Sequence, residues 1–348
     1  MRVTRRRLNR TLLLRQGLLE RGPGTVGEVC RRLVGLQAQE NLPPYLGLEA
    51  RLTALDPHEV TQGLEDRSLV RILSLRGTIH LLTADDALLV RSWTQPVHER
   101  ERRASGYVRP ALGIDRERFT AAVDDVLADG PLPVSELGER LAEVFPDVPA
   151  KALGQHARAT EPLVQVPPRG AWKASGGVVY QRLDRWLGRP IPEPDPPALV
   201  RRYLAAFGPA TAADVTAWSG IPGLAAVLGD QPDLVRLTHE SGATLFDVPG
   251  APLADEAVHA PVRLLGTYDN LWLAHAKRDR VTTPEARQRW AGVNGGSGHV
   301  VLVDGQLAGL WAVADGRPSV VELFGRQTRL QQRELDDELE RVAVLLAR

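Results

Sequence analysis

The sequence predicts an α+β fold, in which small helical units with β-hairpins follow one another and lead into a C-terminal β-barrel. Three observations predict it. A Gly-Pro pair recurs between helix-like segments, two β-rich arms follow each time, and alternating apolar residues replace the helical pattern after residue 260. With 348 residues, of which 43% are hydrophobic, the chain is long enough for two or three domains with their own cores.

The helices are predicted from the segments on either side of each Gly-Pro pair. Amphipathic stretches precede the pairs that begin at Gly22, Gly130 and Gly208, and a second helix-like stretch follows each. Gly ends the first helix and Pro blocks its continuation. A hydroxyl residue shortly afterwards is predicted to cap the second helix, at the positions Thr25, Ser135 and Thr211.

The hairpins are predicted at residues 69–83, 162–183 and 234–248, where two β-rich arms flank a Gly-containing, partly charged turn. Helix, turn, helix, further helix and hairpin is the order of a winged helix. The chain is therefore predicted to hold three winged-helix units in tandem. Residues 188–197 carry five prolines and are predicted to form an extended linker before the third unit.

The C-terminal part is predicted from two turns and a helix. Asp304-Gly305 lies between alternating apolar runs, which is a strong hairpin signal, and a second turn is predicted near Asp315-Gly316. The last segment places Leu335, Leu339, Val342 and Leu346 on one helical face, and the strands are predicted to form a small barrel closed by this helix. The predicted domains are 1–110, 111–188, 189–258 and 259–348.

Composition excludes several classes of protein. The formal net charge is zero, so the whole molecule makes no case for a polyanionic partner. Arginine supplies 40 of the 43 basic residues, as a GC-rich genome would also produce, so only the position of an arginine is informative. The single cysteine, Cys30, permits no disulfide within the chain and no cysteine-based metal site. No apolar run approaches the roughly 18 residues of a membrane span, so a cytoplasmic protein without a membrane partner is expected.

The commonest enzyme motifs are absent. The chain has no Walker loop, no G-x-G-x-x-G after a strand, no G-x-S-x-G and no H-E-x-x-H, and its eight histidines are scattered. No metal and no organic cofactor are therefore expected. This narrows any catalysis to side chains that act without such help.

Basic residues gather on the predicted hairpins and their flanks. Charged hairpin tips are either simply solvated or placed to contact phosphate and wedge into a groove, and the two interpretations weigh about evenly. Three such units in one chain favour DNA binding. The candidate DNA-binding residues are Arg71, Arg76, Arg158, Arg169, Lys173, Lys277 and Arg278.

The candidate catalytic residues are Gln37 and Gln39, in the stretch "GLQAQ". A glutamine amide is no base near pH 7, but its oxygen accepts and its nitrogen donates a hydrogen bond, so two amides can hold a water molecule in position. Taken alone, such a pair is common at helix ends and carries little information. Weaker candidates are His80, Asp269 and Asn270, for which structural or capping roles are favoured, and Glu40 as a titratable helper.

Several segments together resemble one family from end to end. They include "LVGLQAQENLPPYLGLEARL", "DRSLVRILSLRGTIHLLTADD", "GPATAADVTAWSGI" and "LLGTYDNLWLAHAKRDRV". They are similar to the AlkZ/YcaQ-like winged-helix DNA glycosylases, a bacterial family concerned with alkylation damage and self-resistance to a DNA-alkylating natural product. The resemblance implies three tandem winged helices and a C-terminal β-barrel, which form a C-shaped DNA-binding channel. It also implies that Gln37 and Gln39 form the Gln-x-Gln catalytic motif.

The resemblance implies a monofunctional DNA glycosylase. Its substrate is double-stranded DNA with bulky or crosslinked N7-alkylpurines, whose base is cationic and leaves neutral, so weak amides suffice. No lysine lies near the motif to form a Schiff base, so an abasic site is the expected product. The alternatives are a non-catalytic winged-helix DNA-binding protein, such as a regulator, and a protein that sequesters a DNA-alkylating drug. The chain shows no dimerisation helix, which favours a monomer.

Overall fold

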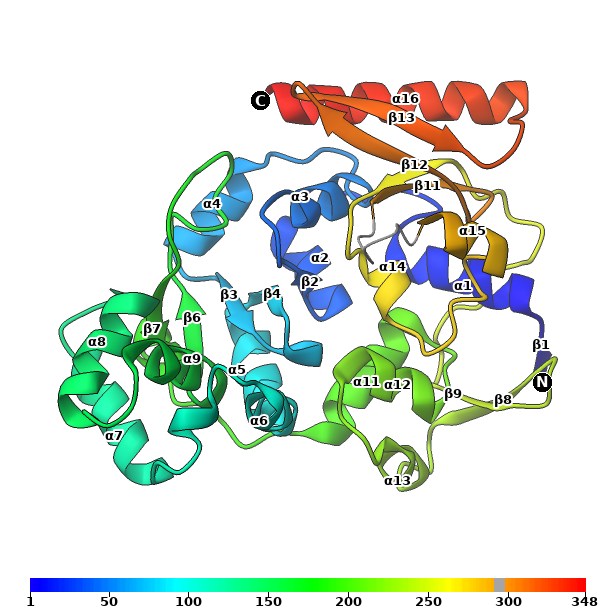
Figure 1. Ribbon diagram of the computed structural model, residues 1–348. Helices are drawn as coiled ribbons and strands as arrows, with labels where there is room; N and C mark the ends of the chain where they lie inside the picture. The colour runs from blue at the N-terminus through cyan, green and yellow to red at the C-terminus, as the bar shows by residue number, and fades with distance from the viewer. Residues whose placement is uncertain (291–297) are drawn as a thin grey trace. The chain divides into compact units, whose positions relative to one another are not determined.

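The computed structural model describes residues 1–290 and 298–348 and confirms an α+β fold (Figure 1). The chain divides into two compact units. Unit 1 comprises Met1–Pro57, Pro197–Trp218 and Pro222–Arg348, and unit 2 comprises His58–Pro196 and Ser219–Ile221. One boundary between them, at Pro196–Pro197, falls in the predicted proline-rich linker. In the described part of the chain, no helix combines the length and the apolar character needed to cross a membrane.

Unit 2 is a sheet surrounded by helices. Its helices are α4 (His58–Glu65), α5 (Ala84–Trp93), α6 (Gln95–Ala104), α7 (Arg116–Val126), α8 (Val134–Val144), α9 (Ala150–Thr160) and α10 (Leu183–Leu187), with two 3₁₀ turns, η1 (Leu75–Gly77) and η2 (Arg109–Ala111). Its strands are β3 (Leu69–Leu73), β4 (Ile79–Thr83), β5 (Leu132–Pro133), β6 (Leu163–Gln165) and β7 (Val179–Arg182).

The first two predicted hairpins are confirmed in unit 2, but they are not separate. β3 pairs with β4 and β6 pairs with β7, both antiparallel, and β3 also pairs with β6, so that the strands run in the order β4-β3-β6-β7-β5. Every residue of β3 and β4 is buried. A second core lies between α7, α8 and α9, where Phe119 and Leu137 are fully buried.

Unit 1 gathers the two ends of the chain. Its helices are α1 (Arg5–Gln16), α2 (Val26–Leu33), α3 (Leu42–Glu49), α11 (Pro196–Phe207), α12 (Ala212–Ser219), α13 (Leu224–Gly229), α14 (Asn270–Leu273), α15 (Pro284–Trp290) and α16 (Arg329–Ala347). Its strands are β1 (Arg2–Val3), β2 (Leu36–Gln37), β8 (Val235–His239), β9 (Thr244–Asp247), β10 (Arg263–Leu265), β11 (His299–Val303), β12 (Gln306–Ala314) and β13 (Arg317–Leu323).

The third predicted hairpin, β8–β9, is also confirmed, and the N-terminal strand joins it. β1 pairs in parallel with β8, so the sheet order is β1-β8-β9. Arg15 of α1 makes two hydrogen bonds, of 2.8 and 2.7 Å, to the carboxylate of Asp247 at the end of β9, and both side chains are buried. This ion pair fixes the first helix to a hairpin more than 200 residues away along the chain.

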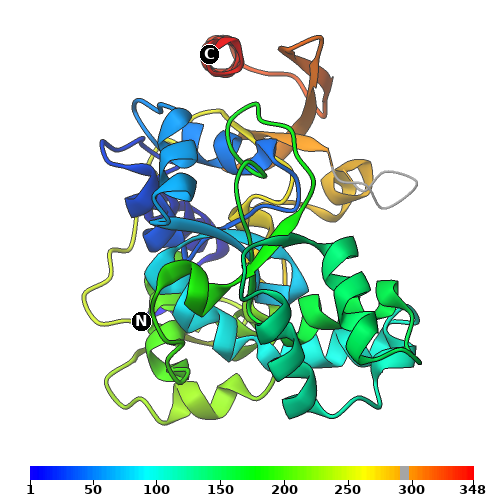
Figure 2. The same ribbon diagram turned by 90° about the vertical axis from the view of Figure 1, so that its left-hand side faces the viewer.

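Within the described residues, the C-terminal strands form an open antiparallel sheet in the order β10-β11-β12-β13, so the predicted β-barrel is not confirmed. Both predicted turns are confirmed: Asp304 and Gly305 have φ of 47° and 73°, and Asp315 and Gly316 have φ of 52° and 73°, as two-residue hairpin loops require. Four strands are too few to close around side chains, for which about eight are usual. Instead α16 packs against β10 and β13, beside the β12–β13 hairpin in both ribbon views (Figures 1 and 2).

Helix α16 is held in unit 1 by a buried carboxylate and by buried apolar residues. Glu338, which is buried, accepts hydrogen bonds from Arg21 at 2.7 Å and from Arg263 at 3.2 Å. Leu335 and Val342 are buried as predicted, but Leu345 takes the place predicted for Leu346.

Two of the predicted caps are confirmed and one is wrong. Thr25 forms a capping box at the start of α2, and Thr211 accepts a hydrogen bond from the Asp214 amide of α12. Helix α8 begins one residue before Ser135, with Pro133 at its N-cap, so Ser135 is not a cap. The first helix ends at Gly17, in the left-handed conformation, and not at the Gly-Pro pair five residues later.

Candidate functional site

The Gln-x-Gln motif follows a sharp turn at the end of α2. Val34 and Gly35 have φ of 52° and 90°, and the Gly35 amide donates a hydrogen bond of 2.8 Å to the carbonyl oxygen of Cys30. Gln37 ends β2 with only 7% of its surface exposed. Gln39, on the other side of a fully buried Ala38, is exposed. The left-handed residues thus end the helix and direct the chain straight into the motif.

Asn270 holds this turn from a distant part of the chain. Its side-chain nitrogen donates a hydrogen bond of 2.7 Å to the carbonyl oxygen of Gly35, and Asn270 is buried at the first position of α14. The preceding residue, Asp269, caps α14 by accepting a hydrogen bond of 3.0 Å from the Leu271 amide. Of the sequence candidates, Asn270 therefore contacts the backbone of Gly35, two residues before Gln37, and Asp269 acts as a helix cap.

Asp269 is itself held by a buried ion pair with Arg51. The two guanidinium nitrogens of Arg51 lie 2.7 and 2.8 Å from the two carboxylate oxygens of Asp269, and both side chains are at most 1% exposed. Arg51 also donates to the carbonyl oxygen of Gly47 at 2.8 Å and to the Gln16 amide oxygen at 3.2 Å. The two terminal nitrogens of Arg51 are thus hydrogen-bonded, and a bidentate pair of this kind fixes the geometry of the groups that it joins.

The cations Lys277 and Arg278 lie on a loop that is fastened at several points to unit 1. The Tyr203 hydroxyl donates to the carbonyl oxygen of Ala274 at 2.7 Å, and Asp214 accepts from the Ala276 amide at 3.0 Å. At the far end of the loop, the Asn9 side chain donates to the carbonyl oxygen of Arg280 at 2.7 Å. The cations therefore project from a fixed backbone.

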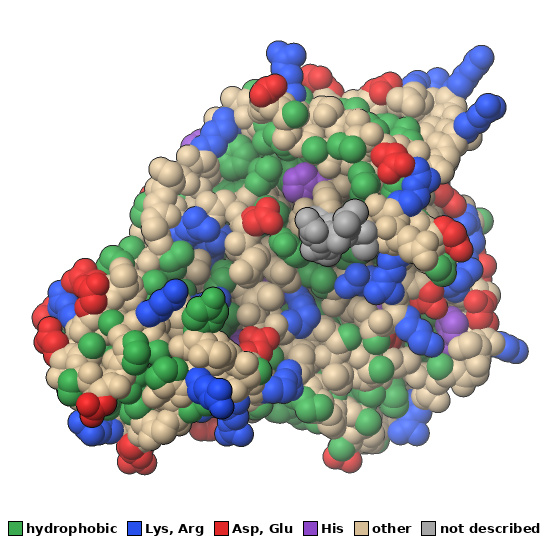
Figure 3. All heavy atoms as spheres, viewed as in Figure 1, with side chains coloured by type: hydrophobic (Ala, Val, Ile, Leu, Met, Phe, Trp, Pro, Cys, Tyr) green, Lys and Arg blue, Asp and Glu red, His purple; other side chains and the backbone are tan. Residues whose placement is uncertain are grey.

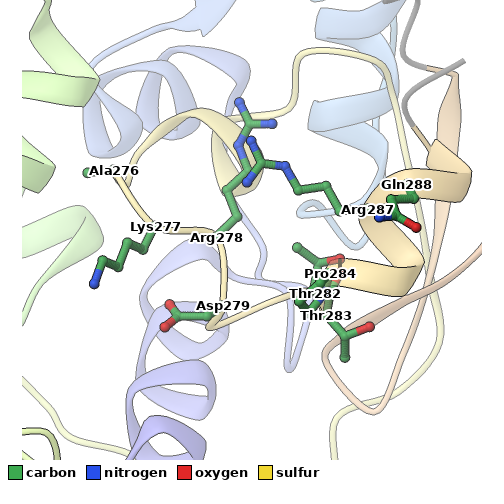
Figure 4. A pocket seen from close by; sticks show the side chains of 9 residues that line it. All are labelled: Ala276, Lys277, Arg278, Asp279, Thr282, Thr283, Pro284, Arg287 and Gln288. Atoms are coloured by element: carbon green, nitrogen blue, oxygen red, sulfur yellow. Dashed lines mark hydrogen bonds between the residues drawn. The ribbon is translucent and has the colours of Figure 1, made fainter. Parts of the chain in front are cut away.

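This loop and α15 form a pocket of about 540 Å³ (Figure 4). The pocket is lined by Ala276, Lys277, Arg278, Asp279, Thr282, Thr283, Pro284, Arg287 and Gln288. Its lining contains three cations and one carboxylate, so it favours an anion. Burial, followed by the positive charge of Arg287, lowers the pKa of Arg278 from its ordinary value.

His80, Arg76 and Arg71 belong to the β3–β4 hairpin of unit 2. His80 is 1% exposed, its Nδ1 lies 3.1 Å from the Thr78 carbonyl oxygen and its Nε2 lies 3.3 Å from Arg76. Nδ1 therefore carries the hydrogen and donates a hydrogen bond to the Thr78 carbonyl oxygen, and Nε2 accepts a hydrogen bond from Arg76. Burial, and then the charge of Arg76, lowers the pKa of His80 to about 3. Both ring nitrogens of His80 thus have partners, as expected of the structural histidine that the sequence favours, and a role in the active site stays a prediction.

Arg71 lies inside the sheet, and its role in DNA binding stays a prediction. It is 2% exposed, and its Nε lies 3.4 Å from the side-chain oxygen of Gln165 on β6. Gly170 leaves room for it, since a Cβ atom there would lie 2.2 Å from the Arg71 Cδ.

The remaining predicted DNA-binding residues lie in two places in unit 2. Arg158, on α9, lines a pocket of about 190 Å³ with Glu101, whose pKa is raised by burial. Arg169 and Lys173 lie in the β6–β7 loop, where the Trp172 amide donates to the Thr61 hydroxyl at 3.0 Å. The Lys173 nitrogen is 5.6 Å from the centre of the Trp172 ring, so the loop presents a cation beside an aromatic ring.

The distribution of charge and of metal-binding side chains indicates few further candidate sites. Figure 3 shows basic and acidic side chains interspersed over the viewed face, in keeping with a net charge of zero. Within residues 1–290 and 298–348, no group of three or more His, Cys, Asp or Glu side chains is arranged to hold a metal ion.

Two residues of these sites were missed by the sequence reasoning: Arg51 and Arg287. Arg51 has a recognisable signal, since it follows an apolar helical segment, and a buried arginine needs an acidic partner. Arg287 has no such signal in the sequence, where it resembles any exposed arginine. Only the fold shows that α15 places it opposite Arg278.

Comparisons with known proteins agree along nearly the whole chain. A family model described as DNA glycosylase AlkZ-like matches residues 30–345. An interstrand DNA cross-link repair glycosylase from Streptomyces sahachiroi is 28% identical over 352 aligned positions, which cover 94% of this chain and 93% of the relative. The solved structure of the Streptomyces sahachiroi DNA glycosylase AlkZ matches with a TM-score of 0.75 and 25% identity, over 100% of this chain and 98% of that one.

Proposed function

Because the chain belongs to the AlkZ-like DNA glycosylase family, we propose that it hydrolyses the N-glycosidic bond of bulky or crosslinked cationic N7-alkylpurines in double-stranded DNA. The activity is that of a DNA N-glycosylase, an enzyme of DNA repair. The relative is named for the repair of interstrand cross-links, which supports a substrate of this kind. We further propose that the β3–β4, β6–β7 and β8–β9 hairpins are the wings of three winged-helix units, and that the enzyme acts as a monomer.

The observation that carries the proposal is the geometry of the Gln-x-Gln motif. Gln37 and Gln39 follow a turn that Cys30 and Asn270 hold through the two polar groups of the Gly35 backbone. A fixed backbone is what a positioning mechanism needs, because an amide contributes orientation and a dipole rather than a proton.

The proposed reaction is hydrolysis at the anomeric carbon. Gln37 and Gln39 orient one water molecule, and their carbonyl dipoles stabilise the positive charge that develops on the sugar. The water oxygen bonds to the anomeric carbon while the bond from that carbon to N9 of the purine breaks. The electron pair of this bond passes to the cationic purine, which leaves neutral, and the attacking water releases a proton to solvent. The product is an abasic site.

The substrate class follows from the weakness of these groups. An unmodified purine leaves as an anion and needs a general acid, which neutral amides do not supply. Alkylation at N7 places a positive charge on the base before the enzyme acts. The motif is therefore suited to a substrate that arrives activated.

The test is base release from duplex DNA that contains one N7-alkylguanine, followed by alkaline cleavage of abasic sites. We expect release by the wild type and loss of release when Gln37→Ala is combined with Gln39→Ala, with DNA binding retained. Gln332→Ala, an exposed glutamine of α16, is the control and should release base at the wild-type rate. Undiminished release by the double variant would show that other residues carry the reaction.

A further inference from the structure

Arg278 and Arg287 bring two positive charges together in the pocket of Figure 4, where their guanidinium groups extend toward one another. Arg287 is among the causes that lower the pKa of Arg278. In the described part of the chain, neither side chain forms a salt bridge with a carboxylate. Arg289, also on α15, differs in this respect because it pairs with Glu322. Two like charges that no salt bridge neutralises, in a pocket where cations outnumber the single carboxylate, make a place for an anion.

The Arg278 side chain and the helix that carries Arg287 are also held in position. The Arg278 guanidinium carbon lies 5.5 Å from the centre of the Trp290 ring, so the side chain rests on an aromatic surface. The Thr283 hydroxyl accepts a hydrogen bond of 3.2 Å from the Ala286 amide at the start of α15, which fixes the helix that carries Arg287. The backbone of Arg280 accepts from Asn9 and also from Gln306, at 2.8 Å. The backbone that carries both arginines is thus fixed, and the Arg278 side chain is ordered before an anion binds.

We infer that Arg278 and Arg287 bind a single phosphate group of the DNA backbone between them, with Lys277 at the edge of the pocket. Planar guanidinium forks match the oxygens of a phosphate, and one monoanionic phosphodiester between them reduces the repulsion of the pair. DNA as the source of the phosphate rests on the proposed function. The site itself rests on the pocket and its charges.

A shared phosphate makes a specific prediction for salt dependence. The slope of log affinity against log salt falls by about one for each phosphate contact that is lost. We expect Arg278→Gln, Arg287→Ala and their combination each to lower the slope by about one, since all three remove the same contact. If the slope instead fell by about two in the double variant, while each single variant lowered it by about one, the arginines would bind two separate phosphates and the shared site would be overturned. An unchanged slope in all three variants would overturn phosphate binding altogether.

The measurement uses the full chain and an undamaged duplex, followed by fluorescence anisotropy, so its outcome is independent of base release. Arg289→Ala is the matched control on the same helix and should keep the wild-type slope. Titration with inorganic phosphate distinguishes the two possible sources of the bound group, which are the DNA backbone and a free phosphate ion. Phosphate binding that is lost in Arg287→Ala, together with an unchanged DNA slope, would identify a small-anion site and overturn the assignment to DNA.

Discussion

Asn270 donates a hydrogen bond of 2.7 Å from its side-chain nitrogen to the carbonyl oxygen of Gly35, two residues before Gln37. The bond joins a residue of α14 to the turn that carries the catalytic candidates, across 235 positions of sequence. The first prediction concerns this contact.

Asn270→Asp should slow base release at saturating DNA while leaving DNA affinity unchanged. The substitution keeps the size of the side chain but replaces the donor by an oxygen that repels the Gly35 carbonyl. Because misplacement of a catalytic group by about 1 Å can cost about a hundredfold in rate, we expect a decrease of at least tenfold. Single-turnover kinetics measure the rate, and anisotropy measures the affinity.

A matched control is available for Asn270. Gln181, in unit 2, is another buried amide that donates to a carbonyl oxygen, that of Leu127, at 3.1 Å. Gln181→Ala should lower stability but leave the rate of release unaltered. An equal rate decrease in both variants would assign the effect of Asn270 to stability alone.

The second prediction concerns the stability contributed by the Arg51–Asp269 pair. Arg51→Met leaves a carboxylate that is 1% exposed without its cation, so it should lower the free energy of unfolding by about 3–5 kcal/mol. Chemical denaturation measures this change. Arg140→Ala breaks an ion pair whose side chains are 44% and 42% exposed, and it should cost less than about 1 kcal/mol. Similar losses in both variants would contradict the argument from burial.

The third prediction concerns acid stability and His80. Its pKa is about 3 in the folded protein, against about 6.5 in an unfolded chain, so the unfolded state binds the proton first. The stability that depends on neutral His80 is therefore fully present above about pH 6.5 and is lost as the pH falls toward 3. His80→Gln should reduce the loss between about pH 6 and pH 4 by up to about 1.4 kcal/mol per pH unit.

Urea titrations at a series of pH values measure this slope. At about pH 8 the side chain at position 80 is uncharged in the wild type and in His80→Gln, whether the protein is folded or unfolded. A difference in stability between the two proteins at that pH therefore reports only packing and hydrogen bonding. If the curves of stability against pH for the wild type and His80→Gln ran parallel below about pH 6.5, unfolding would not be coupled to protonation of His80.

The fourth prediction concerns the pH dependence of catalysis. Glutamine does not ionise, and Glu40, the titratable neighbour of the motif, is exposed. The rate of base release should therefore vary by no more than about twofold between about pH 6.5 and pH 8.5. Glu40→Gln should retain this rate, as measured under single-turnover conditions. A large loss in Glu40→Gln would instead assign a general base to the reaction.

Much of the fold could be predicted from local chemistry in the sequence. The turns at Asp304-Gly305 and Asp315-Gly316 form as predicted because few residues accept the positive φ that a two-residue loop needs. Thr25 caps α2 for a similarly local reason. The motif at Gln37 and Gln39 was also found from the sequence, although only the resemblance of the surrounding segments made it informative.

The tertiary structure decided the features that depend on distant partners. The pairing of β3 with β6, the open sheet under α16 and the parallel pairing of β1 with β8 leave no local signal. The Asn270–Gly35 contact and the opposition of Arg278 and Arg287 likewise arise only when separate segments pack. Hydrophobic burial is not directional, so a sequence pattern shows which faces are buried but not what covers them. The sequence thus determined the elements and the chemical type of the motif, and the packing determined what holds and surrounds it.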